Sequence, residues 1–307
     1  MLEIKRAHFP GISAYLLFLA ILLWGCAPKI QDSERYKPSE SLLEILADFQ
    51  RHLKDDTYRF ATFKDITGQN IYKATLRRLN NFERLHPNKF SPILAYSRAK
   101  AYEKLHDFKA AVASYRQIVG TGSELEPQAK EGLKVCQDYL AAEALVPTGG
   151  SISETLKGFD KRLKALEGLI EIHKGTPYEN LSREVEEKAA IERVSYLETN
   201  RERIQNGTEL TIVEYNLLIK RHEDSKNVYR HILRLGSFFE TLARQYANRH
   251  DPEGLSFSMD EFKSYADSAM GLYAMVASKD GIIEKAEAQG LTNSLRAYIM
   301  KVRNLHR

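Results

Sequence analysis

The stretch PILAYSRAKAYEKLHDFKAAVASYRQIVGTGS, residues 92–123, decides the fold of this chain. Apolar and small residues recur in it at the three- and four-residue spacing of one face of an α-helix. The segment His106-Asp107-Phe108 interrupts this spacing and indicates a turn. We therefore expect one helix over residues 92–105 and a second over 108–119, packed together as a hairpin.

Helical spacing extends over most of the 307 residues. Glycine and proline contribute only 17 and 9 residues, which is below their usual combined share of about 12%. No segment alternates apolar and polar residues between hairpin turns, so the expected fold class is all-α. Besides the hairpin, we expect helices over residues 41–54, 70–85, 126–145, 151–174, 177–205, 211–249 (one helix or two), 259–288 and 292–305.

Several expected helix starts have the pattern Ser/Thr-x-x-Glu. In this pattern each of the two side chains can satisfy a free backbone amide at the other's position. Asn206-Gly207 is expected to end the helix that precedes it. The segments with the pattern are Ser41–Glu44, Ser151–Glu154, Thr176–Glu179, Thr211–Glu214 and Ser258–Glu261.

The segment Pro147-Thr148-Gly149-Gly150 is the clearest linker in the chain and predicts a domain boundary. The expected organisation has four parts. They are a signal peptide over residues 1–25, a polar tether over 26–40, a helical domain with repeat character over 41–146 and a helical bundle of unknown role over 151–307.

Residues 92–123 carry small and aromatic residues at set positions. If Pro92 is position one, Ala99 and Ala111 occupy the small positions, and Tyr102 and Tyr115 the aromatic ones. In these features the stretch resembles one tetratricopeptide repeat, a helix-turn-helix unit of about 34 residues. A small residue lets the neighbouring helix approach closely, and the ring fills the space beside it.

The match to the repeat is incomplete. Ala95, Arg98 and Ile118 depart from the usual residue types, and Ser123 stands where the closing proline is expected. Residues 79–87 resemble the end of a preceding repeat, and 127–145 could begin a following one. Residues 151–307 show no repeat pattern. The alternative for residues 92–123 is an ordinary amphipathic helical hairpin.

The resemblance also implies a place for a partner. Proteins of this repeat family bind peptide segments along a groove lined by the first helix of each repeat. Carried over by position, this face includes a tyrosine beside two lysines, which would suit a peptide carboxylate; the alternative is a solvated helix face. The residues are Ile93, Tyr96, Lys100, Glu103 and Lys104.

The N-terminus has a basic start followed by an apolar run over residues 12–24, typical of a secretory signal peptide. The run ends in Leu23-Trp24-Gly25-Cys26, which resembles the lipobox of bacterial lipoproteins, although the bulky Trp24 is unusual there. The resemblance implies cleavage before Cys26, a diacylglyceryl thioether on its sulfur and usually an N-acyl chain, with palmitate as a typical acyl group. The alternative is an uncleaved membrane helix that begins near Phe9.

Ala27 follows the cysteine, where an Asp would favour retention in the inner membrane of enteric bacteria. We therefore expect a lipid anchor that faces the periplasm, with the outer membrane favoured over the inner. Loss of residues 1–25 changes the formal net charge from +4 to +3, which is too small to suggest a nucleic-acid partner. With Cys26 lipidated, Cys136 is the only cysteine with a free thiol, and we interpret it as a small core residue.

A search for catalytic or metal-binding patterns leaves weak candidates. Glu83 and His86, like Glu103 and His106, have the Glu-x-x-His spacing of carboxylate-bridged di-iron bundles, but both histidines fall at helix ends. Glu40-Ser41 resembles part of the lytic transglycosylase motif, whose companion Gly-Leu-Met-Gln is missing. We expect no catalytic residue, no metal and no cofactor.

Together these patterns predict a non-enzymatic, membrane-anchored helical scaffold that binds a protein partner in the cell envelope. Among repeat proteins, the chain distantly resembles the tetratricopeptide lipoproteins of the outer-membrane barrel-assembly machinery. An accessory lipoprotein of a periplasmic solute-transport system, with a small ligand, is the alternative. An enzyme of envelope polymers is a third and weaker one.

Overall fold

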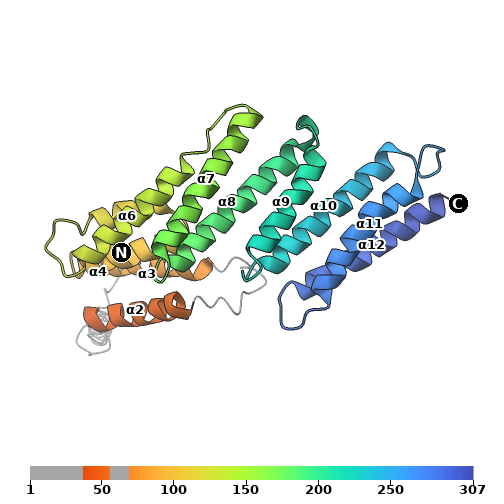
Figure 1. Ribbon diagram of the computed structural model, residues 1–307. Helices are drawn as coiled ribbons and strands as arrows, with labels where there is room; N and C mark the ends of the chain where they lie inside the picture. Colours follow the sequence, from red (N-terminus) through yellow and green to blue (C-terminus); the bar gives the residue numbers. More distant parts are fainter. Residues whose placement is uncertain (1–36, 56–68, 307) are drawn as a thin grey trace, which may run out of the picture. The chain divides into compact units, whose positions relative to one another are not determined.

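The computed structural model describes residues 37–55 and 69–306 (Figure 1). This part of the chain contains eleven α-helices and no β-strand, so the predicted all-α class is confirmed. The signal peptide, Trp24 and Cys26 lie outside the described residues. In chain order the α-helices are α2 (Pro38–Asp55), α3 (Asn70–Leu85), α4 (Ser91–Lys104), α5 (Phe108–Arg116), α6 (Glu126–Glu143), α7 (Ile152–His173), α8 (Glu179–Asn200), α9 (Gly207–Arg221), α10 (Val228–Arg249), α11 (Met259–Ala277) and α12 (Lys285–Leu305).

The chain divides into two compact units, Met1–Leu140 and Ala141–Arg307, which we call the N-terminal and C-terminal units. The boundary expected at residues 147–150 stays a prediction.

In the N-terminal unit, helices α2, α3 and α4 share an apolar core. One cluster joins Leu42 of α2 to Phe82 of α3 and Leu94 of α4. The hairpin of α4 and α5 forms where the sequence predicts it. Asp107 caps α5, since its carboxylate accepts a hydrogen bond of 3.0 Å from the backbone N–H of Ala110.

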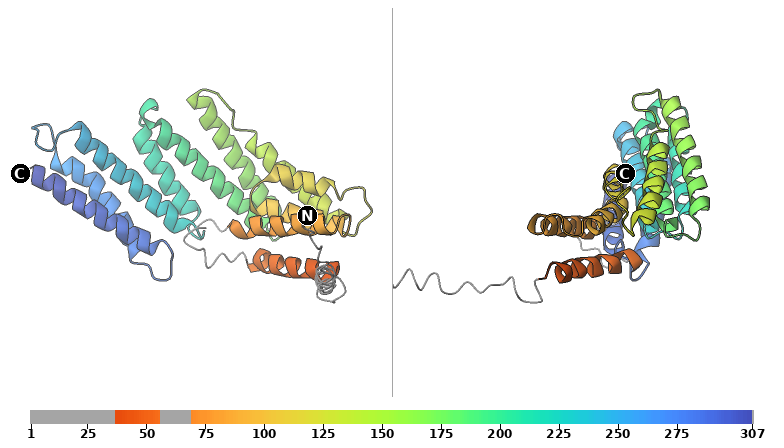
Figure 2. Two further views of the ribbon diagram at one scale, coloured as in Figure 1. Left: turned by 180° about the vertical axis from the view of Figure 1, so that it is seen from behind. Right: turned by 90° about the vertical axis from the view of Figure 1, so that its left-hand side faces the viewer.

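In the C-terminal unit, α7 to α12 follow one another side by side, and each helix packs against its neighbours in the chain (Figures 1 and 2). Gly236 of α10 lets α11 approach closely. A Cβ atom at this position would lie 2.6 Å from the ring of Tyr273, so only glycine fits without a shift.

Two predicted helix starts are confirmed in atomic detail. At α7 the Ser151 hydroxyl accepts from the Glu154 backbone N–H at 3.2 Å, and the Glu154 carboxylate accepts from the Ser151 N–H at 2.8 Å. This is the full capping box. At α11 the Ser258 hydroxyl accepts from the Glu261 N–H at 3.3 Å. Helix α3 has the predicted bounds, residues 70–85.

Replacing Ser151 by alanine is expected to destabilise the start of α7 by about 1 kcal/mol, because the Glu154 backbone N–H loses its acceptor and the Glu154 carboxylate loses the hydroxyl as a donor. Ser153, which is exposed in the same first turn, supplies the control: Ser153→Ala should have almost no effect. Hydrogen exchange of the first amides of α7 measures the difference. Equal exchange in the two variants would show that the box contributes nothing.

The expected helix start at Ser41 is wrong. Helix α2 begins at Pro38, and the Ser41 N–H donates to the Lys37 carbonyl at 3.1 Å, as in the first turn of a helix. Proline has no N–H and has a fixed φ, which suits the first position of a helix. The last residues of the predicted tether therefore belong to α2.

Later boundaries are also corrected. The helix expected to end at Asn206 ends earlier, because α8 ends at Asn200 and a short 3-10 turn, Arg201–Arg203, follows it. Asn206, in the left-handed conformation with φ 54°, directly precedes α9, which begins at Gly207, four residues before the expected Thr211. The last two helices separate at residues 278–284, where Gly281 has φ +77°, and not near residue 290. Residues 211–249 form two helices, the second of the alternatives given for them.

Candidate functional site

The five residues predicted to contact a partner all lie on α4, but they do not share one exposed face. Ile93, Tyr96, Lys100 and Lys104 are half-buried, whereas Glu103 is only 2% exposed. Glu103 is therefore not available to a partner in this structure. The predicted face is reduced to the other four residues.

The Glu103 carboxylate is held inside the N-terminal unit by three neighbours. The Tyr115 hydroxyl donates to it at 2.6 Å, the Lys100 ammonium lies 2.5 Å from its second oxygen, and the Cys136 thiol lies 3.7 Å away. Such a buried carboxylate is stable only with these partners. Burial, together with the charges of Glu103 and Glu131, raises the pKa of Tyr96.

Cys136 is completely buried, which confirms the prediction of a core residue. Burial in the first place, and the nearby Glu103 carboxylate in the second, raise the pKa of its thiol far above the ordinary value. The thiol therefore stays protonated and is a poor nucleophile.

The repeat positions are occupied as close packing requires. Ala99, Ala111 and Tyr115 are fully buried, and Tyr102 is half-buried. The Tyr115 ring lies over Gly132 of α6, where a Cβ atom would be 2.4 Å from it. Both a degenerate repeat and an ordinary helical hairpin are compatible with this packing.

The glutamate of each Glu-x-x-His pair contacts other side chains of the protein. Glu83 forms an ion pair with Arg98, and Glu103 is the buried acceptor described above. Within residues 37–55 and 69–306, no group of three or more His, Cys, Asp or Glu side chains is arranged to hold a metal ion. Glu40 and Ser41 lie in the first turn of α2.

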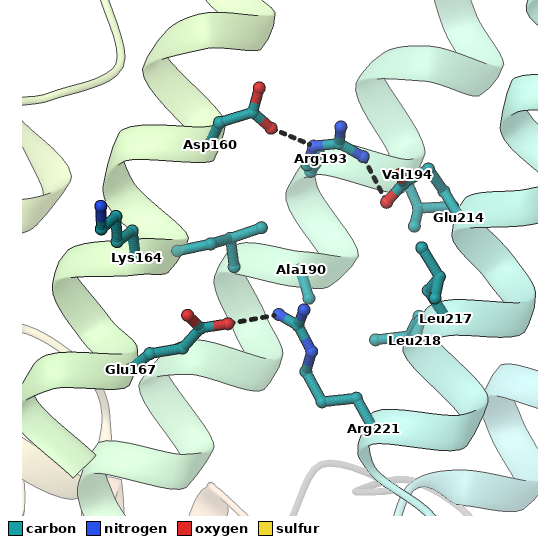
Figure 3. Close-up of a pocket in the computed structure, with 11 residues that line it drawn as sticks. Asp160, Lys164, Glu167, Ala190, Arg193, Val194, Glu214, Leu217, Leu218 and Arg221 are labelled. Carbon is teal, nitrogen blue, oxygen red and sulfur yellow. Dashed lines mark hydrogen bonds and ion pairs between the residues drawn. The ribbon is translucent and has the colours of Figure 1, made fainter. Parts of the chain in front are cut away.

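A concave site of the C-terminal unit lies between α7, α8 and α9 (Figure 3). It is a groove with a cavity of about 340 Å³. Its floor is apolar, and its rim is charged, with acidic and basic side chains from all three helices. The floor residues are Leu163, Ala190, Val194, Leu217 and Leu218. The charged residues are Asp160, Lys164, Glu167, Arg193, Glu214 and Arg221.

Two sets of ion pairs cross this groove. In the first, Arg193 of α8 lies between two carboxylates, 3.1 Å from Asp160 of α7 and in contact with Glu214 of α9. In the second, Arg221 of α9 lies 3.3 Å from Glu167 of α7. Figure 3 shows both sets on either side of the apolar floor. We call them the Arg193 strap and the Arg221 strap.

Helix α9 has a second apolar stripe that faces away from the core. The core-facing side of α9 carries the buried residues Thr211, Tyr215 and Leu218. On another side, Leu210, Val213 and Leu217 are 42%, 52% and 47% exposed, and their spacing of three and four places them on one face. This stripe is a candidate interaction surface.

Sequence reasoning missed the groove. The signal was present in α9, whose apolar residues are too numerous for a single core-facing stripe. Their exposure, however, depends on how α7 and α8 pack, which one sequence does not specify. The charged rim comes from residues that lie far apart in the chain.

The Arg221 strap is connected to a buried polar cluster beneath it. Arg221 also contacts Glu186 of α8 at 2.8 Å, and His222 lies 3.1 Å from the same carboxylate group. Next to it, Glu187 accepts hydrogen bonds from His231 at 2.6 Å, from Ser225 at 2.7 Å and from Asn227 at 3.3 Å. We call this set, including both glutamates, the Glu186–Glu187 cluster.

This cluster keeps both carboxylates charged. Burial by itself would raise the pKa of each glutamate. Contacts with His222 and Arg221 outweigh burial at Glu186, and hydrogen bonds from His231 and Ser225 outweigh it at Glu187, so that both pKa values lie below the ordinary 4.5. The cluster fixes the turn between α9 and α10 to α8.

The sequence matches no known protein-family model, and no curated protein matches it at a significant level. None of the helices in the described part of the chain is long and apolar enough to cross a membrane.

Proposed function

We propose that this protein is a non-enzymatic helical scaffold, anchored to a membrane of the cell envelope through acylated Cys26, that binds a protein partner. The observation that carries the proposal is the groove of the C-terminal unit. The groove combines an apolar floor and an exposed apolar stripe with a border of paired charges. This composition is typical of a protein-binding surface. The lipobox-like segment supports the anchor. In the groove, Arg193 is paired with Asp160 and Glu214, and Arg221 is paired with Glu167.

A small ligand of a solute-transport system is the second candidate, and the cavity is the observation that favours it. Its volume of about 340 Å³ lies at the lower end of the range of small-molecule sites, about 300–1,000 Å³. The stripe of α9 extends beyond the cavity, which suits a longer partner better. Thermal stabilisation by a small molecule, with no co-purifying protein, would favour this second function.

Cross-linking in intact cells followed by mass spectrometry tests the main proposal. We expect cross-links between this chain and another envelope protein, at the surface of α4 or at the groove. If cross-linking yields only the chain itself while purified protein turns over peptidoglycan, the scaffold proposal is wrong. Glu40→Gln is the variant that would abolish such turnover in the transglycosylase alternative.

Replacing Cys26 by alanine is expected to abolish incorporation of labelled palmitate and to move the protein from the membrane fraction to the soluble periplasmic fraction. Two or more acyl chains hold a protein firmly at about 0.8 kcal/mol per buried methylene, and the variant would carry none. Cys136→Ala is the control, and it should keep the label. Label retained in Cys26→Ala would refute the anchor.

A further inference from the structure

Helix α3 of the N-terminal unit carries a row of positive charges on its outer face. Lys73, Arg77 and Arg84 are exposed, and their spacing of four and seven residues places them on one side of the helix, over about 16 Å. Arg84 donates to the amide oxygen of Asn81 at 3.5 Å, and among the described residues no carboxylate pairs with any of the three. We call Lys73, Arg77 and Arg84 the α3 ridge.

The surroundings of the ridge keep this positive excess. Asp48 of α2 pairs with Arg78 at 2.8 Å, and Glu83 pairs with Arg98 of α4, so neither carboxylate neutralises a ridge cation. Over residues 37–53 and 69–90, positive groups outnumber carboxylates by seven to four. The positive groups are Lys37, Arg51, Lys73, Arg77, Arg78, Arg84 and Lys89, and the carboxylates are Glu40, Glu44, Asp48 and Glu83.

Two large apolar side chains are exposed at one end of the ridge. Leu85, the last residue of α3, is 68% exposed, and Phe90, directly before α4, is 39% exposed. Each follows a basic residue in the chain, Arg84 and Lys89 respectively. Basic side chains next to exposed leucine and phenylalanine are typical of protein surfaces that lie in a membrane interface.

The chain from the proposed anchor enters the unit at the same end. Leu42 of α2 shares an apolar cluster with Phe82 of α3, and the ring centre of Phe49 lies 6.3 Å from that of Tyr72. The two helices are therefore antiparallel, and the start of α2 lies beside the end of α3. Cys26 precedes α2 by twelve residues, which span at most about 40 Å. An anchor at Cys26 thus keeps this end near the bilayer.

The shape of the ridge suits a flat partner. It is the outer face of a single helix, so a flat anionic surface can approach all three cations together. An extended peptide, by contrast, typically binds in a groove or along a strand edge. Each Lys or Arg held at an anionic lipid surface strengthens membrane binding, and three of them amount to about a hundredfold.

We propose that the N-terminal unit lies on the membrane with the α3 ridge against the phosphates of anionic phospholipids. Leu85 and Phe90 then lie at the level of the headgroups. This inference rests on the proposed function, since acylated Cys26 holds this face near the bilayer. It assigns the lipid surface to the N-terminal unit and leaves the protein partner to the groove of the C-terminal unit.

The first experiment measures vesicle binding without the anchor. The chain that follows the signal, residues 26–307 with Cys26→Ala, is mixed with vesicles of phosphatidylcholine alone or with about one third phosphatidylglycerol, and bound protein is separated by flotation. At an ionic strength of about 0.1 M we expect binding to the anionic vesicles to be at least about tenfold stronger. Most of this preference should disappear at about 1 M, where the Debye length is only about 3 Å.

Charge reversal of the ridge gives the decisive variant. Lys73→Glu, Arg77→Glu and Arg84→Glu together should abolish the preference for anionic vesicles, because the ridge then repels lipid phosphates. All three side chains are exposed, so the far-UV circular dichroism spectrum should not change.

Helix α12 supplies the matched control. Arg296→Glu, Lys301→Glu and Arg303→Glu together reverse three exposed cations of another helix and change the net charge by the same amount. This variant should keep most of the preference. Equal binding of the parent chain to both kinds of vesicle, or equal losses in the two triple variants, would overturn the inference.

The second experiment separates the inference from the proposed anchor. A photo-crosslinking benzoylphenylalanine replaces Asn80, an exposed residue between Arg77 and Arg84, or Gln289 of α12, in two variants of the full chain that are irradiated in intact cells. Cross-links to phospholipid from position 80 but not from 289 support the inference. If a palmitate-labelled chain gives no lipid cross-link from position 80, or gives one to an acidic protein instead, the inference is wrong and the anchor stands. If the chain takes up no palmitate, the anchor is wrong, and the vesicle experiment alone decides the ridge.

Discussion

Replacing Glu187 by leucine is expected to lower the free energy of unfolding of the C-terminal unit by about 3–5 kcal/mol. The variant leaves the donors of His231, Ser225 and Asn227 without their shared acceptor in a buried site. His231 is only 1% exposed, so water cannot replace the lost carboxylate without opening the structure. Denaturant unfolding followed by far-UV circular dichroism measures the loss, and hydrogen exchange assigns it to α8, α9 and α10.

The pH dependence of the free energy of unfolding provides a second test of the role of Glu187. Because the pKa of Glu187 is lowered in the folded state, its contribution to stability is complete above about pH 4.5 and is lost as the pH falls through the folded-state value. In Glu187→Leu, stability should therefore fall less steeply below about pH 4.5 than in the parent chain.

Two further variants serve as controls. Glu187→Gln keeps a carbonyl acceptor and should lose much less stability than the leucine variant. Glu171→Leu removes an exposed glutamate of α7 and should change stability by at most about 0.5 kcal/mol. If the leucine variants at positions 187 and 171 were equally stable, Glu187 would not be the acceptor that holds the turn.

Replacing Phe262 by alanine is expected to cost about 3–5 kcal/mol, the second large effect. Phe262 is completely buried, with its ring centre 5.8 Å from that of Phe257 and 6.1 Å from that of Tyr298. Truncation loses the transfer free energy of the ring and leaves a cavity between α11 and α12. Thermal unfolding monitored by circular dichroism, with hydrogen exchange of α11 and α12, measures the effect.

The control for this variant lies on the same helix. Met275 of α11 is exposed, so Met275→Ala should change stability by at most about 0.5 kcal/mol. If the two variants unfolded at the same denaturant concentration, the core of the C-terminal unit would not depend on Phe262.

Local sequence signals predicted much of the fold. Helix α3 has the expected bounds because Pro87 prevents its continuation, and Ser151 with Glu154 begins α7 as its side-chain chemistry requires. The signal at Ser41 failed for an equally local reason, since Pro38 offers a better start three residues earlier. Where two possible helix starts lie close together, their order along the chain does not determine which of them begins the helix.

The site could not be predicted in this way. Glu187 and His231 are 44 residues apart, and Asp160 and Arg193 are 33 apart, so their contacts depend on how α7, α8, α9 and α10 pack. Glu103 shows that packing can also bury a residue that the sequence suggests is exposed. Its position on α4 suggested an exposed face, but Tyr115 of the next helix reaches it and covers it.

The close contact at Gly207 sets a limit on how the sequence of this unit can diverge. A Cβ atom at this position would lie 2.1 Å from the carbonyl oxygen of Arg201, a backbone atom that a rotamer change cannot move. The connection over residues 201–206 can therefore vary in composition but has little room to vary in length. A glycine at the first position of α9, directly after a residue able to adopt the left-handed conformation, is thus a signature by which distant relatives of this unit can be recognised.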